Sequence, residues 1–325
     1  MAMRTFAGVL LVVLASVAGS PTYGQSTAPG AAPTYPTKPI RIFTATAGGS
    51  SDFISRLIAQ GISGPLGQPV VVENRGGILA AEPVSKSAPD GYSLLINAGT
   101  WYVATLLEKL TYDPIRDFAP ITITNTTPNI LVVHPSLPVK SAKELVALAR
   151  AQPGALNYGS GGIGGGGHLS GELLKSLARI NIVHIAYKGS GRSVPALVAG
   201  EVQLTFSDFE PLAPHVKSGR LRALAVTSAL PSALFPDLPT LASSVPGYVS
   251  IANTGVFASA KTPAAIINRL NQEIVRFLRT PEAKERILKT GAEVVGSTPD
   301  ELAAWVNTDL AQWGKVIKDS GIKAN

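Results

Sequence analysis

Short apolar runs and longer amphipathic stretches alternate along the chain from Pro36 onward. Runs bounded by Gly or Pro predict strands, and apolar residues recurring every three or four positions predict helices. The first part of the chain is therefore expected to hold strands at 39–44, 69–73 and 92–97, helices at 52–62 and 101–110, and β-rich segments at 121–124 and 130–133. The continuously apolar strand at 69–73 is predicted to be buried. Strand, helix and strand in succession predict a parallel sheet.

The same alternation restarts after residue 138 and predicts a second sheet. Ser141 and Glu144 have the spacing of a capping box, ahead of a helix that ends near Arg150. Further helices are expected at 168–177 and 193–199, with Gly200 as the C-terminal cap of the latter. The strands of this part are expected at 182–185, 202–206 and 223–226.

The last third of the chain is mainly helical after a strand-like segment at 255–258. Thr262 is expected to cap a helix with Pro263 at its first position, and a capping box from Thr298 to Glu301 precedes a final helix with an apolar stripe. These helices have no sheet of their own and should pack on the first sheet. We therefore expect an α/β protein with two lobes, lobe 1 at 35–128 plus 254–325 and lobe 2 at 129–253. The two connecting strands form a hinge near 129–133 and 253–258.

The N-terminal segment at 1–25 has the pattern of a signal peptide. A short basic start containing Arg4 precedes an apolar stretch from Thr5 to Ala18, which is too short to span a membrane and ends in small residues. Cleavage is expected between about residues 18 and 25, and residues 26–34 are expected to form a linker. The protein is thus predicted to be exported.

Composition and charge exclude several classes of function. The formal charge of +7 comes from 28 Lys and Arg against 21 Asp and Glu, and the basic residues are scattered singly. This pattern argues against a nucleic-acid partner and favours a modest attraction for small anions. The absence of Cys excludes disulfides, thiolate metal sites and cysteine nucleophiles. The four histidines lie too far apart in sequence to share a helix face, so no metal site is expected: His134, His168, His184 and His215.

A glycine-containing loop at 47–52 lies between the first predicted strand and its helix. Its amides and the positive end of the helix dipole favour an anion, so the loop can be an anion cradle. It can also be an ordinary turn, with Ser50 or Ser51 as the N-cap and Asp52 offsetting the dipole. The local sequence leaves both interpretations open.

The stretch from Tyr158 to His168 has seven glycines in eleven residues. It is a second candidate site built on backbone amides, or else a flexible linker. A dinucleotide site is not favoured, because residues 181–188 contain no acid, and no Lys-Ser/Thr follows to form a phosphate-binding Walker loop. His168 can contact a ligand or cap the following helix. Tyr187 and Asp208, each after a predicted strand, can orient a polar ligand group or simply form turns.

The chain resembles the substrate-binding proteins of tripartite tricarboxylate transporters, the Bug receptors, over about residues 35–323. The motifs that carry the resemblance are Tyr-Pro-Thr-Lys-Pro-Ile (35–40), Gly-Gly-Ser-Ser-Asp (48–52), Val-Glu-Asn-Arg-Gly-Gly (72–77), Ala-Pro-Asp-Gly-Tyr-Ser-Leu-Leu (88–95), Tyr-Asp-Pro-Ile-Arg-Asp-Phe-Ala-Pro (112–120), Tyr-Lys-Gly (187–189), Gly-Arg-Leu-Arg-Ala-Leu-Ala-Val-Thr (219–227) and Phe-Pro-Asp-Leu-Pro-Thr (235–240). The resemblance implies a monomeric periplasmic receptor that closes on a small carboxylate and presents it to large and small membrane subunits. It also implies a type II-like fold in which each lobe is a mostly parallel sheet flanked by helices.

In this family the first loop and the glycine loop bind the ligand, mostly through backbone amides. The resemblance therefore implies the following ligand-binding residues, with no cofactor and no catalytic group: Thr44, Ala47, Gly48, Gly49, Ser50, Ser51, Asp52, Asn97, Ser160, Gly161, Gly162, Ile163, Gly164, His168, Tyr187 and Asp208. The chain departs from the family at 45–49, at 253–255 and at 185–187, which points to an unusual ligand or to reduced affinity for the usual carboxylates.

Two other functions stay open from the sequence. One is a periplasmic hydrolase that uses Ser160 or Ser50 with His168, although no G-x-S-x-G motif occurs. The other is a receptor that feeds a signalling system instead of a transporter. Dicarboxylates, tricarboxylates, aromatic acids and amino acids are all possible ligands.

Overall fold

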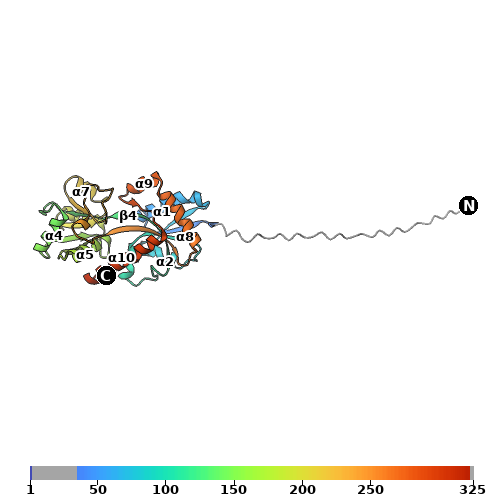
Figure 1. The fold of residues 1–325 in the computed structure, drawn as a ribbon, viewed down its shortest axis with the longest axis horizontal. Coiled ribbons are helices and arrows are strands. Elements are labelled where there is room, and N and C mark those ends of the chain that lie inside the picture. Colours follow the sequence, from blue (N-terminus) through green and yellow to red (C-terminus); the bar gives the residue numbers. More distant parts are fainter. Residues whose placement is uncertain (2–34, 323–325) are drawn as a thin grey trace. The chain divides into compact units, whose positions relative to one another are not determined.

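The structure is a computed structural model that describes Met1 and residues 35–322. The predicted signal peptide, apart from Met1, and the predicted linker lie outside the described residues. Helices and strands alternate through the described part as the apolar pattern predicts (Figure 1). Within this part, no helix is long and apolar enough to cross a bilayer.

The first sheet contains six strands, three of which run parallel. Strands β1, β2 and β3 are parallel neighbours, whereas β10 runs antiparallel to both β3 and β4. The strands follow the order β11-β4-β10-β3-β1-β2. Their bounds are β1 (Ile40–Thr44), β2 (Val70–Asn74), β3 (Ser93–Ala98), β4 (Phe118–Pro128), β10 (Ile251–Ser259) and β11 (Glu293–Val294).

The second sheet has five strands in the order β7-β6-β8-β5-β9. Strands β6, β7 and β8 are parallel, and β5 runs antiparallel to its neighbours β8 and β9. The bounds are β5 (Ile130–Val133), β6 (Asn157–Ser160), β7 (Val183–Ala186), β8 (Leu204–Ser207) and β9 (Arg222–Val226).

Both sheets share one topology. The three parallel strands of each sheet, numbered along the chain, lie in the order 2-1-3. The next position is filled by a strand that enters from the other sheet, β10 in the first and β5 in the second. This confirms the predicted two-lobed α/β fold. The sheets are mixed rather than mostly parallel, because each entering strand runs antiparallel to its neighbours.

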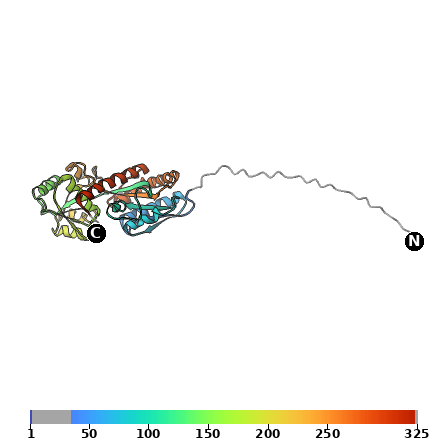
Figure 2. The same ribbon diagram turned by 90° about the horizontal axis from the view of Figure 1, so that it is seen from below.

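Helices cover both sheets. Helices α8 and α10 contact β4 of the first sheet, α8 also contacts α1, and α10 continues to α5 beside the second sheet (Figure 2). The helices are α1 (Ser50–Leu66), α2 (Ala81–Ser85), α3 (Thr100–Val103), α4 (Ala142–Ala151), α5 (Gly166–Ala178), α6 (Ser190–Val198), α7 (Ala213–Lys217), α8 (Ala264–Leu278), α9 (Pro281–Leu288) and α10 (Pro299–Ser320), with 3₁₀ turns η1 (Gly77–Ala80), η2 (Ala104–Leu106) and η3 (Leu241–Ser243).

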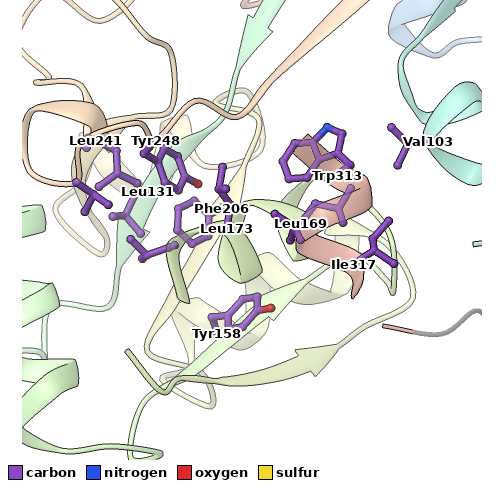
Figure 3. Packing of buried hydrophobic residues seen from close by; sticks show 14 of the residues in the cluster. Val103, Leu131, Tyr158, Leu169, Leu173, Phe206, Leu241, Tyr248, Trp313 and Ile317 are labelled. Atoms are coloured by element: carbon purple, nitrogen blue, oxygen red, sulfur yellow. The ribbon is translucent and has the colours of Figure 1, made fainter. Parts of the chain in front are cut away.

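The C-terminal helix α10 is the element that joins the two cores. Its predicted capping box is present, with the Thr298 side chain accepting from the Glu301 amide and the Glu301 carboxylate accepting from the Thr298 amide. Further along the helix, Trp313 and Ile317 belong to the same buried cluster as Leu169 of α5 (Figure 3). The returning C-terminal chain therefore packs on the first sheet and also on α5, which lies beside the second sheet.

The structure corrects two predictions in the first part of the chain. Strand β2 is at the edge of its sheet, so Val71 is exposed instead of buried. The helix expected at 101–110 is only α3 followed by the turn η2. The chain turns back because Tyr112 packs against Trp101, and its hydroxyl donates to the Trp101 carbonyl at 3.0 Å.

Two predictions near the returning strand also need correction. Thr262 does not cap the next helix, because its hydroxyl donates to the Ser259 carbonyl and α8 begins at Ala264 after Pro263. The hinge expected at 253–258 falls inside β10, where Asn253 pairs with β4. The chain enters the first sheet at the start of β10.

Candidate ligand-binding site

Three loops meet at one edge of the second sheet, because β6, β7 and β8 are parallel and their carboxyl ends lie together. The Tyr187 amide donates to the Ser160 carbonyl at 2.9 Å, and the Gly189 amide donates to the Gly161 carbonyl at 2.8 Å. The structure thus brings the predicted residues of the glycine loop together with Tyr187. Gly162, Ile163 and Tyr187 line a hollow of about 340 Å³, here called the Tyr187 hollow, whose full lining is Leu107, Glu108, Gly162, Ile163, Ala186, Tyr187 and Lys188.

The glycine loop leads into α5, whose first amides are free of helical partners. Gly165 is the N-cap and has no side chain to cap the helix, and the first helical bond runs from the Leu169 amide to the Gly165 carbonyl. The amides of Gly166, Gly167 and His168 precede that bond and have no acceptor within the helix. Together with the helix dipole, they form a site for a negative charge.

Gly164 is a position where only glycine fits. Its φ of +74° lies in the left-handed region, and a Cβ atom there would lie 2.7 Å from Cδ1 of Leu107, which comes from the first part of the chain. The Gly164 amide donates to Nδ1 of His168 at 3.0 Å. The loop is therefore held in one conformation and is not a flexible linker.

His168 and a histidine that sequence reasoning missed lie stacked below this loop. The rings of His168 and His184 are 3.8 Å apart between centroids, and Nε2 of His184 lies 2.7 Å from Oγ of Ser160. Burial lowers the pKa of His184 to about 4, with the neighbouring His168 adding to this effect, and burial also lowers the pKa of His168. Both rings are neutral at pH 7. His168 thus positions the loop through Gly164, and no sequence spacing indicated His184.

The arrangement does not match a hydrolase triad. Ser160 pairs with His184 and not with His168. Within the part of the chain that the structure describes, no carboxylate contacts His184, whereas a triad needs an acid on the second ring nitrogen. The nearby Glu172 carboxylate accepts from the Tyr158 hydroxyl and the Lys175 ammonium, both at 2.7 Å.

The first predicted loop, at 47–52, covers the exposed end of the connection after β1 and the first residues of α1, whose N-cap Gly49 again has no side chain. The Asp52 carboxylate accepts from the Gly48 amide at 2.9 Å, from Asn74 at 2.8 Å and from Arg56 at 2.9 Å. Burial raises the pKa of Asp52, but these hydrogen bonds outweigh burial and hold the pKa below its ordinary value. Asp52 therefore fixes the loop. Ala47 and Ser50 are exposed beside it.

Thr44, Ser51 and Asn97 are buried behind the first loop. The Thr44 hydroxyl donates to the Ile96 carbonyl at 2.8 Å, and the Ser51 hydroxyl lies 3.5 Å from Oδ1 of Asn97. Oδ1 of Asn97 also accepts from the Ala98 amide at 2.9 Å. These side chains join β1, α1 and β3, so they support the loop from inside.

Asp208 lies at the carboxyl end of β8 and its side chain is exposed. The surrounding protein nevertheless desolvates the carboxylate and raises its pKa, and repulsion from Glu210 adds to the rise. Asp208 shares the sheet edge with Ser160 and Tyr187, as predicted from its place after a strand, but it lines neither the Tyr187 hollow nor the hollow described next.

A second hollow, of about 70 Å³, lies where the two sheets approach each other. We call it the Asp309 hollow. It is lined by Ala98, Gly99, Thr100, Tyr102, Val103, Asn129, Gly164, Gly166, Leu169, Ser250, Ile251, Ala252, Asn253, Asp309 and Trp313. Residues of the segment 98–108, which begins at the end of β3 in the first sheet, contribute to the lining of both hollows. The loop at 47–52 lines neither hollow.

Sequence reasoning missed Asp309, although the sequence carries a signal. Asp309 occupies the apolar stripe of α10, between Val306 and Trp313, and it is 8% exposed. An acid at a position where helical spacing calls for an apolar residue is unusual. The Tyr102 hydroxyl donates to its Oδ2 at 2.8 Å.

Two mixed sheets that exchange a strand, with a glycine-lined helix N-terminus at the hollow between them, define a two-lobed solute-binding protein. The family model described as "Tripartite tricarboxylate transporter family receptor" matches residues 54–322. The chain therefore belongs to this family of TctC and Bug-type receptors.

Among curated proteins, BugT of Bordetella pertussis is 34% identical over 306 residues, covering 91% of this chain and 93% of BugT. The UPF0065 protein in the tcbD-tcbE intergenic region of Pseudomonas sp. strain P51 is 33% identical over 298 residues, covering 90% of this chain and 89% of that protein.

Among solved structures, Rpa4515 of R. palustris with adipate has a TM-score of 0.72 and 35% identity, covering 89% of this chain and 99% of that one. MatC of Rhodopseudomonas palustris with bound malate has a TM-score of 0.69 and 28% identity, covering 87% and 100%. These likenesses extend over nearly the whole folded part of the chain.

Proposed function

We propose that this protein is a periplasmic receptor that captures a small organic anion between its two lobes for a tripartite tricarboxylate-type transporter. The observation that carries the proposal is the N-terminus of α5. Its N-cap is a glycine, and the amides of Gly166, Gly167 and His168 have no helical acceptor.

A carboxylate is the ligand group that this site favours. Unpaired amides and the positive end of a helix dipole stabilise a negative charge, and the loop at 159–168 contains no Lys or Arg to supply a salt bridge. The neighbouring histidines are neutral at pH 7, so the attraction comes from the backbone. The related structures with adipate and malate support a carboxylate as the ligand class.

The remaining parts of the proposal concern the closed receptor and its partners. We infer that the lobes at 35–128 plus 254–325 and at 129–253 open and close about the two crossovers, and that closure brings the first loop at 44–52 onto the ligand. The exported receptor then presents its ligand to the large and small membrane subunits. The first amides of α1, which have no acceptor within the helix and no side-chain cap, support a contact of this loop with an anion.

Calorimetry of the mature protein with a panel of organic acids that includes adipate and malate tests the proposal. At least one acid should bind, and Gly166→Val should weaken its binding at least tenfold, because a branched side chain then covers the amides that line the hollow. The nearest atom to a Cβ at residue 166 is Nδ2 of Asn129 at 3.6 Å, so a Cβ fits there without a clash, and circular dichroism checks that the variant is folded.

Gly64→Val is the matched control, because a Cβ at Gly64 in α1 meets nothing within 4 Å and Gly64 lies away from both hollows. It should bind like the unaltered protein. The proposal is wrong if none of the acids binds, or if Gly166→Val and Gly64→Val bind equally well.

A further inference from the structure

The Asp309 hollow contains a buried negative charge that the carboxylate site does not use. Asp309 is 8% exposed and accepts hydrogen bonds from the Tyr102 hydroxyl and from Trp313. Among the described residues no Lys, Arg or His lies within ion-pair distance of it, although 13 such pairs occur elsewhere. Burial raises its pKa to about 6, while hydrogen bonds from Tyr102 and Trp313 oppose the rise. At pH 7 the group is therefore mostly ionised and has no countercharge.

Asn253 adds a second unpartnered polar group to the wall of this hollow. It is 6% exposed, and its Oδ1 is buried with no hydrogen-bond partner. A buried amide oxygen without a donor costs free energy, which a hydrogen-bond donor in the hollow would recover. Asp309 and Asn253 come from α10 and β10, so two separate elements contribute residues with acceptor groups to the lining of one hollow.

The lining of the same hollow also includes a region of the reverse polarity. Gly164 and Gly166 belong to this lining, at the positive end of the α5 dipole. The lining of one hollow therefore combines a site for an anion with an ionised carboxylate that has no cationic partner. A molecule that carries both a carboxylate and a cationic group matches both parts of this lining.

We propose that Asp309 and Asn253 bind the ammonium group of the ligand, so that the receptor prefers amino acids over acids of the same skeleton that lack the amine. The inference rests on the proposed function, because it places the ligand's carboxylate on the amides of α5. Asp309 supplies the ion pair, and Oδ1 of Asn253 accepts a further hydrogen bond from the same nitrogen. A ligand that carries only carboxylates would meet repulsion from Asp309.

The test is calorimetry at pH 7.5 with matched pairs of acids: glutamate and glutarate, aspartate and succinate, leucine and 4-methylpentanoate, γ-aminobutyrate and butyrate. In at least one pair the amino acid should bind tenfold or more tightly than its partner, since charged hydrogen bonds of this kind correspond to about tenfold to a hundredfold in affinity. Asp309→Asn should remove that preference and leave the affinity for the deaminated partner unchanged or higher.

Asp319→Asn is the matched control, because Asp319 lies on the same helix, is exposed and pairs with Lys315. It should keep the preference. The pairs are compared first on the unaltered protein, so the result does not depend on whether Asp309→Asn folds.

Equal or weaker binding of every amino acid relative to its partner would overturn the inference and leave the proposed function standing. A preference that survives in Asp309→Asn would also overturn it. If no acid in the panel binds at all, the proposed function fails as well, and the inference fails with it.

Discussion

Asp309→Asn should stabilise the ligand-free protein at neutral and alkaline pH. The Asp309 pKa is about 6 in the fold, against 3.8 for an unperturbed Asp, because burial disfavours the charged form. A carboxyl whose pKa is raised by folding opposes folding at pH values above that pKa, where the buried group must ionise. The destabilisation of the folded state by Asp309 decreases as the pH falls through 6 and disappears below 3.8.

The size of this effect follows from the two pKa values. The Asp309 pKa is about 6 in the folded protein and 3.8 in the unfolded chain. Because one pKa unit corresponds to about 1.36 kcal/mol, ionisation of Asp309 lowers the free energy of unfolding by roughly 3 kcal/mol at pH 8. Asn has nearly the same shape as Asp and its side-chain oxygen can still accept from Tyr102, so the substitution removes the charge with little change in packing. The free energy of unfolding should rise by up to about 3 kcal/mol at pH 8 and by less than about 1 kcal/mol at pH 4.

Urea denaturation at pH 8, 7, 5 and 4 measures this difference. The exposed Asp319→Asn variant serves as the control and should follow the unaltered protein at each pH. A change in the free energy of unfolding that is the same at pH 8 and pH 4 would refute the reasoning. So would a loss of stability at pH 8, because it would mean that Asp309 is paired with a cation in the fold.

Two further predictions concern the elements around the site. Gly167→Ala should lower the free energy of unfolding by about 1–3 kcal/mol, because the new Cβ atom would lie 2.4 Å from the carbonyl oxygen of Phe206, whereas Gly166→Ala should leave it almost unchanged. Equal thermal melting temperatures for these two variants would contradict the expected close approach. Thr298→Ala should cost about 1 kcal/mol through loss of the α10 cap, and Thr308→Ala, an exposed change on the same helix, should cost less. Urea titrations that rank the two threonine variants in the opposite order would show that the cap contributes little.

The order of helices and strands was predictable because apolar spacing, caps and glycines are local signals. The capping box at Thr298 and the helix after the glycine loop both follow from residues within a few positions of each other. The direction of the entering strands was not predictable in this way. The pairing of Leu95 with Phe257 joins segments that the apolar pattern describes separately, so the sequence indicated a returning chain but not the mixed sheets.

The candidate site was predictable to a similar extent. Glycines between a strand and a helix indicated backbone amides, and the structure places Gly162, Ile163 and Gly164 beside a hollow. The stack of His184 on His168 and the contact of Tyr102 with Asp309 depend on tertiary structure, and no local spacing reports them.

The exchange of strands between the sheets determines the order in which the chain can fold. All five strands of the second sheet lie between residues 130 and 226, so this sheet can form before the C-terminal part of the chain is present. The first sheet needs β10 between β3 and β4, and closing that long loop slows its assembly. The buried cluster around Leu169 stays incomplete until Trp313 and Ile317 arrive at the end of the chain. Truncation within α10 would therefore expose apolar surface on β4 and α5 and yield a chain prone to aggregate.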